Sequence, residues 1–255
     1  MRGSPFFEGV PQTELSVEGQ TVRLPVFIYD AVVMVASFPA RLGALRRLMP
    51  DPRISPARLA PGLGVVSVWC AENRDTDIGP YDAVAISVAL NEPWFRSNLP
   101  GRALVGDMRR RQLHGWLHHE PVTTEFARVG GIYFYNAPKF IARIEFEETP
   151  KQRVCRVYEG QEHILTLSGK RIATPRSERI QSFSHLWMDG QRQSLEFTLN
   201  EIAMGFSLRP ALHRWSWGIV IRSPASSPGC SSHGVPSTTR TYPASPKSTS
   251  RSSRG

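Results

Sequence analysis

The residue with the most distinctive chemical setting is Lys139. The chain of 255 residues carries 31 basic residues, but only four of them are lysines, at positions 139, 151, 170 and 247. Lys139 alone stands among aromatic residues, with Tyr133, Phe134 and Tyr135 before it and Phe140 directly after it. A single lysine in aromatic surroundings raises the question of whether its amine acts as a nucleophile.

A lysine is nucleophilic only when its amine is uncharged, and at pH 7 that holds for roughly one molecule in 2,500, because the ordinary pKa is about 10.4. Burial among aromatic rings lowers a lysine pKa by about 3 to 5 units and so supplies free amine near neutrality. The alternating pattern after Pro138, however, groups Lys139 with Arg143, Glu145 and Glu147 on one polar face. Polar faces usually meet water, so the pattern alone favours a solvated lysine.

Other motifs give weaker chemical signals. His114 and His118 have the i, i+4 spacing that ligates metal on a helix, but no cysteine or carboxylate companion stands at a suitable distance. An acidic turn containing Asp75 and Asp77 is typical of a solvated loop rather than a cation site. The chain contains no G-x-S-x-G, P-loop or G-x-G-x-x-G motif. These signals do not support a metal site, Ser/His/Asp catalysis or a phosphate-binding loop.

Composition narrows the class of protein. The formal charge of +9 includes five basic and no acidic residues from Arg222 onward, which leaves 9 − 5 = +4 for the rest of the chain. That remainder is ordinary for a globular domain and does not indicate a nucleic-acid partner. Three cysteines without C-x-x-C spacing, no signal-peptide pattern and no run of about 20 apolar residues predict a cytoplasmic protein without a membrane partner.

The elements that must position Lys139 are mostly strands. An amphipathic helix is predicted over 40–49 and helical pieces over 100–130, including a helix that begins near Pro121 and contains Glu125. Pro39 is expected to end the first strand. Apolar alternation predicts strands over 26–38, 65–71, 81–90, 140–147, 153–158, 163–167 and 194–199. Short spacings favour antiparallel pairing, so the fold class is α+β and mainly antiparallel β.

One predicted strand has a face of small residues. Over 81–90, the residues Tyr81, Ala83, Ala85, Ser87 and Ala89 alternate with Asp82 and four larger apolar residues. Such a face indicates either close packing or the wall of a cavity.

Three segments of different character divide the chain. Residues 1–24 are polar and interrupted by Gly and Pro, as in a loosely held arm, and residues 25–221 form the predicted domain. Residues 222–255 are basic, rich in Ser and Pro, and contain no Leu, Ile, Met, Phe or Trp. Such a tail cannot bury enough apolar surface to offset the entropy of ordering, and we expect it to be disordered.

Four short motifs in register resemble the acetoacetate decarboxylase-like family over about residues 22–210. They are Ala44-Leu45-Arg46-Arg47-Leu48-Met49-Pro50, Ile78-Gly79-Pro80-Tyr81-Asp82, Pro121-Val122-Thr123-Thr124-Glu125 and Ala137-Pro138-Lys139-Phe140-Ile141-Ala142. The resemblance implies antiparallel strands that curl into a cone or barrel around a buried lysine, often within a homo-oligomer. It also implies that Lys139 forms a Schiff base with a small keto acid or ketone, without metal or organic cofactor.

The chain also departs from that family in ways that bear on the reaction. Phe140 replaces the second lysine that follows the Schiff-base lysine, and Ala83 stands where the family has a glutamate. A further acidic position aligns near Val68 or Trp69, and the family's arginine aligns near Ala31. These departures are compatible with decarboxylation, with aldol or dehydration chemistry on a keto acid, or with ligand binding alone.

The remaining expected site residues follow from the motifs. Glu125 and Tyr81 are the matched polar residues that could assist Lys139; their structural alternatives are a helix-capping carboxylate and a packed aromatic. The expected substrate-binding residues are Tyr133, Tyr135, Phe140 and Ala83. Two function classes therefore stay open, a Schiff-base enzyme and a non-catalytic binder of a small metabolite, beside a third reading in which the basic tail binds nucleic acid.

The end of the chain suggests a frameshift. Family members usually continue past the Leu-Arg-Pro at 208–210 into a segment like Leu-Gly-x-His-Pro-Ile-Ala, whereas this chain has Ile-Arg-Ser-Pro at 221–224. A GC-rich gene read one base out of frame through His-Pro-Ile-Ala would give that sequence. An intact reading frame on resequencing, together with close relatives that carry the same tail, would contradict this hypothesis.

Overall fold

The computed structural model describes residues 4–17, 19–91, 99–170, 176–188, 190–204 and 213–217. The predicted tail, including the segment of the frameshift hypothesis, lies outside these residues. Within them the protein is mainly β with three short α-helices, which confirms the mainly β prediction. None of the described helices combines the length and the apolarity needed to span a membrane.

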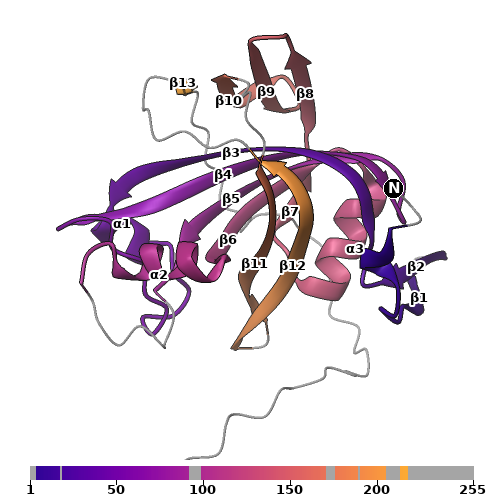
Figure 1. The fold of residues 1–255 in the computed structure, drawn as a ribbon, viewed down its shortest axis with the longest axis horizontal. Helices are drawn as coiled ribbons and strands as arrows, with labels where there is room; N and C mark the ends of the chain where they lie inside the picture. The colour runs from indigo at the N-terminus through magenta and orange to yellow at the C-terminus, as the bar shows by residue number, and fades with distance from the viewer. Residues whose placement is uncertain are drawn as a thin grey trace, which may run out of the picture. The chain divides into compact units, whose positions relative to one another are not determined.

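A large twisted sheet carries most of the described strands (Figure 1). Its strands run in the order β12-β11-β6-β5-β4-β3, and β7 pairs with β6 off this path. Most pairings are antiparallel, but β6 pairs in parallel with both β7 and β11. The strands are β3 (Ile28–Arg41), β4 (Leu63–Thr76), β5 (Tyr81–Ala89), β6 (Gln112–Val122), β7 (Lys139–Ile141), β11 (Arg176–Met188) and β12 (Gln191–Met204).

A second sheet packs against one face of the first. It has the order β13-β10-β9-β8, formed by β8 (Arg143–Glu148), β9 (Gln152–Glu159), β10 (Glu162–Lys170) and β13 (His213–Trp217). Buried residues of β4 and β5, such as Cys70 and Val84, share a hydrophobic cluster with Cys155 and Val157 of β9. The main core therefore lies between the two sheets, and apolar alternation on each strand supplies its inner face.

Three α-helices complete the described core region: α1 (Leu42–Arg47), α2 (Arg102–Arg110) and α3 (Glu125–Tyr135). The helix α3 begins where Thr124 Oγ1 accepts a hydrogen bond from the Ala127 N–H, a standard N-cap. At its other end Asn136 takes a left-handed conformation with φ of 50°, which stops the helix. A hairpin of β1 (Thr13–Val17) and β2 (Gln20–Leu24), preceded by the 3₁₀ turn η1 (Pro5–Phe7), occupies the predicted arm.

Several predicted boundaries were wrong. The strand β3 continues through Pro39, because β3 is an edge strand in the described sheet and a missing N–H is tolerated there. The helix predicted near Pro121 begins at Glu125 instead, since Pro121 still belongs to β6. The histidine-rich part of the helical region is the strand β6, and the strand β11 was not predicted at all.

Candidate active site

The turn after α3 places Lys139 against that helix. Beyond Asn136, the Ala137 N–H donates to the Gly131 carbonyl oxygen at 3.1 Å, so the chain folds back along the helix. Lys139 then opens β7, where it pairs in parallel with Glu120 of β6. The Glu120 N–H donates to the Pro138 carbonyl oxygen at 3.0 Å and holds this register. Two segments distant in sequence thus bring one amine and one carboxylate together.

Lys139 and Glu120 form a nearly buried pair. The Lys139 Nζ lies 3.4 Å from Glu120 Oε1, and the two side chains are 11% and 12% exposed. The solvated lysine that alternation favoured is therefore not what the structure shows. Glu120 was not singled out in the sequence, although it directly precedes the Pro121-Val122-Thr123-Thr124 motif; only the parallel pairing of β6 with β7 reveals it.

The alternation failed at Lys139 because the chain changes sheets. On β8 the pattern holds, with Ile144 buried and Arg143 and Glu145 half exposed. Ala142 separates β8 from β7, which belongs to the large sheet, and its N–H donates to the Val122 carbonyl oxygen at 2.9 Å. Lys139 therefore faces α3 and β6, while Arg143 and Glu145 of β8 are half exposed.

Tyr81 forms one wall beside the lysine. Its ring centroid lies 6.0 Å from Lys139 Nζ, at the outer limit of a cation–π contact. Burial, with smaller contributions from the nearby Glu120 and Tyr135, raises the pKa of the Tyr81 hydroxyl far above its usual value, so this hydroxyl stays protonated. Ala83, which lies on the same face of β5 as Tyr81, is buried against Val122 of β6 and Ala127 of α3.

The other expected site residues are more dispersed. Glu125 is largely exposed on the first turn of α3 and pairs with Arg128, the neighbour one turn on. Tyr133 is 47% exposed. Burial raises the pKa of Tyr135, which packs beside Ala137 and Leu117. Phe140 packs against the inter-sheet core. Their roles in binding or catalysis stay predictions.

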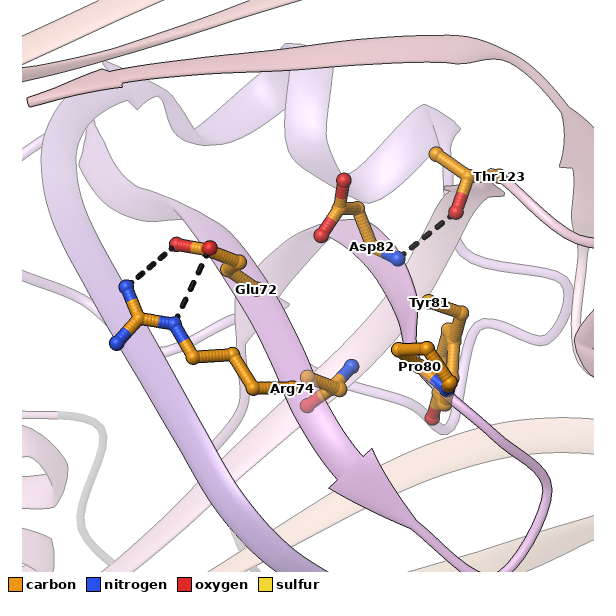
Figure 2. Close-up of a pocket in the computed structure, with 7 residues that line it drawn as sticks. Glu72, Arg74, Pro80, Tyr81, Asp82 and Thr123 are labelled. Carbon is orange, nitrogen blue, oxygen red and sulfur yellow. Dashed lines mark hydrogen bonds and ion pairs between the residues drawn. The ribbon is translucent and has the colours of Figure 1, made fainter.

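A cavity of about 320 Å³ is lined in part by Tyr81 (Figure 2). The side chains of Tyr81 and Asp82 leave β5 in opposite directions, and Lys139 does not line this cavity. The Thr123 hydroxyl accepts a hydrogen bond from the Asp82 N–H at 2.8 Å. The two family-like motifs at 78–82 and 121–125 therefore meet here. The cavity is lined by Glu72, Asn73, Arg74, Pro80, Tyr81, Asp82 and Thr123.

The pKa values of two carboxylates in this cavity, Asp82 and Glu72, are shifted in opposite directions. Burial, reinforced by the charge of Glu72, raises the pKa of Asp82 to about 6. Hydrogen bonds from Arg74 and from Arg153 lower the pKa of Glu72. Arg153, from β9, also bonds Glu148 at 2.8 Å, so its guanidinium joins the two sheets. This cluster contains no lysine and is built as a network of ion pairs.

The histidines do not form a metal site in the described part of the chain. His114 and His118 lie on a strand rather than a helix, and no group of three potential metal ligands occurs among the described residues. His114 Nδ1 instead lies 3.2 Å from His185 Nε2 across the β6–β11 pairing. Burial lowers the pKa of His114 to about 4 and that of His185 to about 3. Both rings are therefore neutral at pH 7.

Comparison with solved structures supports the fold. A structure titled as acetoacetate decarboxylase is 13% identical, covers 78% of each chain and gives a TM-score of 0.53. Acetoacetate decarboxylase from Legionella pneumophila subsp. pneumophila str. Philadelphia 1 is 12% identical over 69% of this chain and 66% of its own, with a TM-score of 0.47. The enduracididine biosynthesis enzyme MppR, complexed with pyruvate, is 12% identical over 62% and 63%, with a TM-score of 0.42.

A family model settles the relationship. None of the curated proteins matches the chain. The model for acetoacetate decarboxylase (ADC) nevertheless matches residues 9–203, which is more than half of the chain and includes Lys139, Glu120 and Tyr81. The chain therefore belongs to the acetoacetate decarboxylase family.

Proposed function

We propose that this protein is a Schiff-base enzyme that acts on a small keto acid or ketone through Lys139. The observation that carries the proposal is the nearly buried pair in which Lys139 Nζ lies 3.4 Å from Glu120 Oε1. Most lysines in proteins are exposed to solvent, so a lysine that is nearly buried beside a carboxylate is a candidate for a functional role. Family membership adds that decarboxylases of this kind share the fold.

Glu120 gives the lysine a partner for proton transfer. A carboxylate beside an ammonium stabilises the charged pair, so the amine becomes nucleophilic only when its proton leaves. Glu120 is placed to accept that proton and, later, to return it to the hydroxyl of the carbinolamine, so that water departs. Phe140 and Ala83 supply neither the second lysine nor the glutamate of the family, so in this proposal the amine is activated by proton transfer to Glu120.

The reaction follows from the amine. Lys139 attacks the carbonyl carbon of the substrate, and loss of water gives a protonated imine. In a 3-oxo acid, the bond to the carboxylate then breaks, carbon dioxide leaves, and the bonding electron pair moves into an enamine. Protonation of the enamine carbon and hydrolysis release the ketone and restore the amine. In a 2-oxo acid such as pyruvate, loss of a proton gives the enamine instead, which can add to an aldehyde.

Borohydride trapping tests the proposal directly. Wild-type protein is incubated with acetoacetate or pyruvate, reduced, and analysed by intact mass and by peptide mapping. We expect one covalent adduct, located on Lys139 and absent from Lys139→Ala and Lys139→Arg. The variant Lys151→Ala, which removes an exposed lysine, is the matched control and should retain the adduct.

The second candidate is a non-catalytic binder in which Lys139 is a charged anchor, and the observation that favours it is the 3.4 Å ion pair between Lys139 Nζ and Glu120 Oε1. In that case no adduct forms with any keto acid tried, pyruvate still raises the melting temperature, and Lys139→Arg retains that shift. A thermal shift without an adduct would therefore replace the enzyme proposal.

The proposal also includes closure of the sheet, the oligomeric state, the location and the domain limits. The two edge strands of the large sheet, β3 and β12, are not paired with each other among the described residues, and closure into a cone or barrel is proposed together with the function. A homo-oligomer, a cytoplasmic location and the domain limits 25–221 are proposed with it. Light scattering of the purified full chain tests the oligomer.

A further inference from the structure

One glycine of α3 lies directly against the Lys139 side chain. Gly131 is buried, and a Cβ atom placed on it would lie 2.5 Å from Lys139 Cε and 2.9 Å from Nζ, and closer still to Cδ. Real Cβ atoms do not approach other heavy atoms so closely. All three nearest atoms belong to this lysine side chain.

The neighbouring glycine has a different environment. Gly130 has no atom within 4 Å of its hypothetical Cβ, although it lies on the same helix one residue earlier. Neither glycine has the positive φ that would by itself exclude a side chain. The two positions therefore share the helical backbone and differ in whether Lys139 occupies the space beside them.

The backbone places Gly131 and Lys139 together independently of this contact. The Gly131 carbonyl oxygen accepts the Ala137 N–H at 3.1 Å, two residues before the lysine. Glu120 is held in register with Lys139 by the β6–β7 pairing. The lysine stem thus lies against the bare helix surface at Gly131, and its amine meets the carboxylate of Glu120.

We propose that Gly131 is a positioning residue: its missing side chain provides the space that holds the Lys139 amine at Glu120. An alanine there can be accommodated without moving the backbone, because the atoms it would meet are the flexible end of the lysine. The lysine then swings away from Glu120. The helix itself is expected to tolerate alanine well, since alanine favours helix over glycine.

The first experiment measures trapping rates and rests on the proposed imine chemistry. With pyruvate and borohydride, Gly131→Ala should lower the maximal rate of adduct formation by about 10- to 100-fold, because a small displacement of the amine removes it from its partner. The pyruvate concentration that gives half the maximal rate should change less than about threefold. The control Gly130→Ala should trap within about twofold of wild type.

The second experiment needs no imine. Melting temperatures are compared for the wild type, Gly131→Ala, Lys139→Ala and the double variant. In the Lys139→Ala background the clash is gone, so Gly131→Ala should raise the melting temperature by about 1 to 4 °C through helix propensity and reduced unfolded-state entropy. In the wild-type background the same change should give a smaller rise or a fall.

Three results would overturn the positioning role: equal trapping by Gly131→Ala and wild type, equal losses in Gly130→Ala and Gly131→Ala, or the same thermal effect in both backgrounds. If the wild type forms no adduct, the Schiff-base function fails, and the melting-temperature cycle alone decides whether Gly131 makes room for Lys139.

Discussion

Two clusters of charged side chains lie on opposite faces of β5. Each pairs a basic side chain with carboxylates, but we expect one to stabilise the fold and the other to carry chemistry. On one face, Arg153 joins Glu72 and Glu148 and so links β9 to β4 and β8. On the other, Lys139 meets Glu120 beside Tyr81. A guanidinium keeps its proton in proteins and offers five donors, so it suits a fixed structural link. An amine can lose its proton and become a nucleophile, so it suits chemistry.

The two clusters also differ in their surroundings. Arg153 stacks its guanidinium 4.6 Å from the Phe146 ring centroid and is held by two carboxylates that are themselves about one-third exposed. Lys139 has one carboxylate, and both partners are nearly buried. A nearly buried lysine paired with one carboxylate is therefore a candidate reactive group. An arginine that bonds carboxylates of both sheets is instead expected to stabilise the fold.

The largest expected effect is on the Lys139 side of this comparison. Glu120→Gln keeps the shape of the side chain but cannot accept a proton, so the rate of adduct formation with pyruvate should fall by about 100-fold. Stopped-flow mixing followed by borohydride quench measures this rate, and circular dichroism checks the fold. The variant Glu147→Gln, at an exposed carboxylate of β8, serves as a control and should react like wild type. Unchanged trapping in Glu120→Gln would remove Glu120 from the mechanism.

The next effect is on stability at the arginine cluster. Arg153→Met leaves Glu72 and Glu148 without their shared partner, and we expect unfolding to become easier by about 1 to 3 kcal/mol. The cost stays in this range because both carboxylates can reach water. Urea unfolding measures it, while trapping at Lys139 should stay within about twofold of wild type.

A matched control for this variant lies on the same strand. Arg156→Met removes an exposed pair with Glu147 and should cost less than about 1 kcal/mol. If Arg153→Met and Arg156→Met lower the free energy of unfolding equally, the link between the sheets stabilises the protein no more than an exposed ion pair does. If Arg153→Met abolishes trapping in a folded protein, the Arg153 cluster contributes to the reaction at Lys139 and its role is not structural alone.

The smallest effect concerns Asp82 and depends on pH. The pKa of Asp82 is raised in the folded protein to about 6, so the folded state binds this proton more tightly than the unfolded chain does. Stability from this group is therefore present at low pH and is lost as the pH rises through 6. Asp82→Asn should raise the free energy of unfolding at pH 7 by about 1 kcal/mol, once solvent screening of this half-buried group is allowed for.

The pH series supplies the control for Asp82→Asn. The gain should shrink as the pH falls from 6 towards 4, because the wild-type carboxyl is then protonated as well. Urea unfolding at pH 4, 5, 6 and 7 measures this trend. A gain that is equal at all four pH values would show that the charge of Asp82 is not its cause.

Much of the fold could be predicted from local patterns. The strand from Tyr81 and the strands β9 and β10 follow from apolar alternation, and α1 follows from its leucine spacing. The strand β6 could not be predicted in this way, because His114, His118 and the interrupting glycine at 115 do not alternate clearly. Its strand conformation depends on pairing with β5 on one side and β11 on the other.

The sequence by itself singled out Lys139 as the candidate nucleophile, since the Pro-Lys motif and its aromatic neighbours are local. It also determined the apolar face of β8, because alternation needs only the neighbouring residues. Only the tertiary structure decided that Lys139 is nearly buried, that Glu120 is its partner and that Gly131 lies directly against its side chain. These three facts arise from a parallel strand pairing and a helix packed across it, and long-range contacts of that kind leave no periodic trace in the chain.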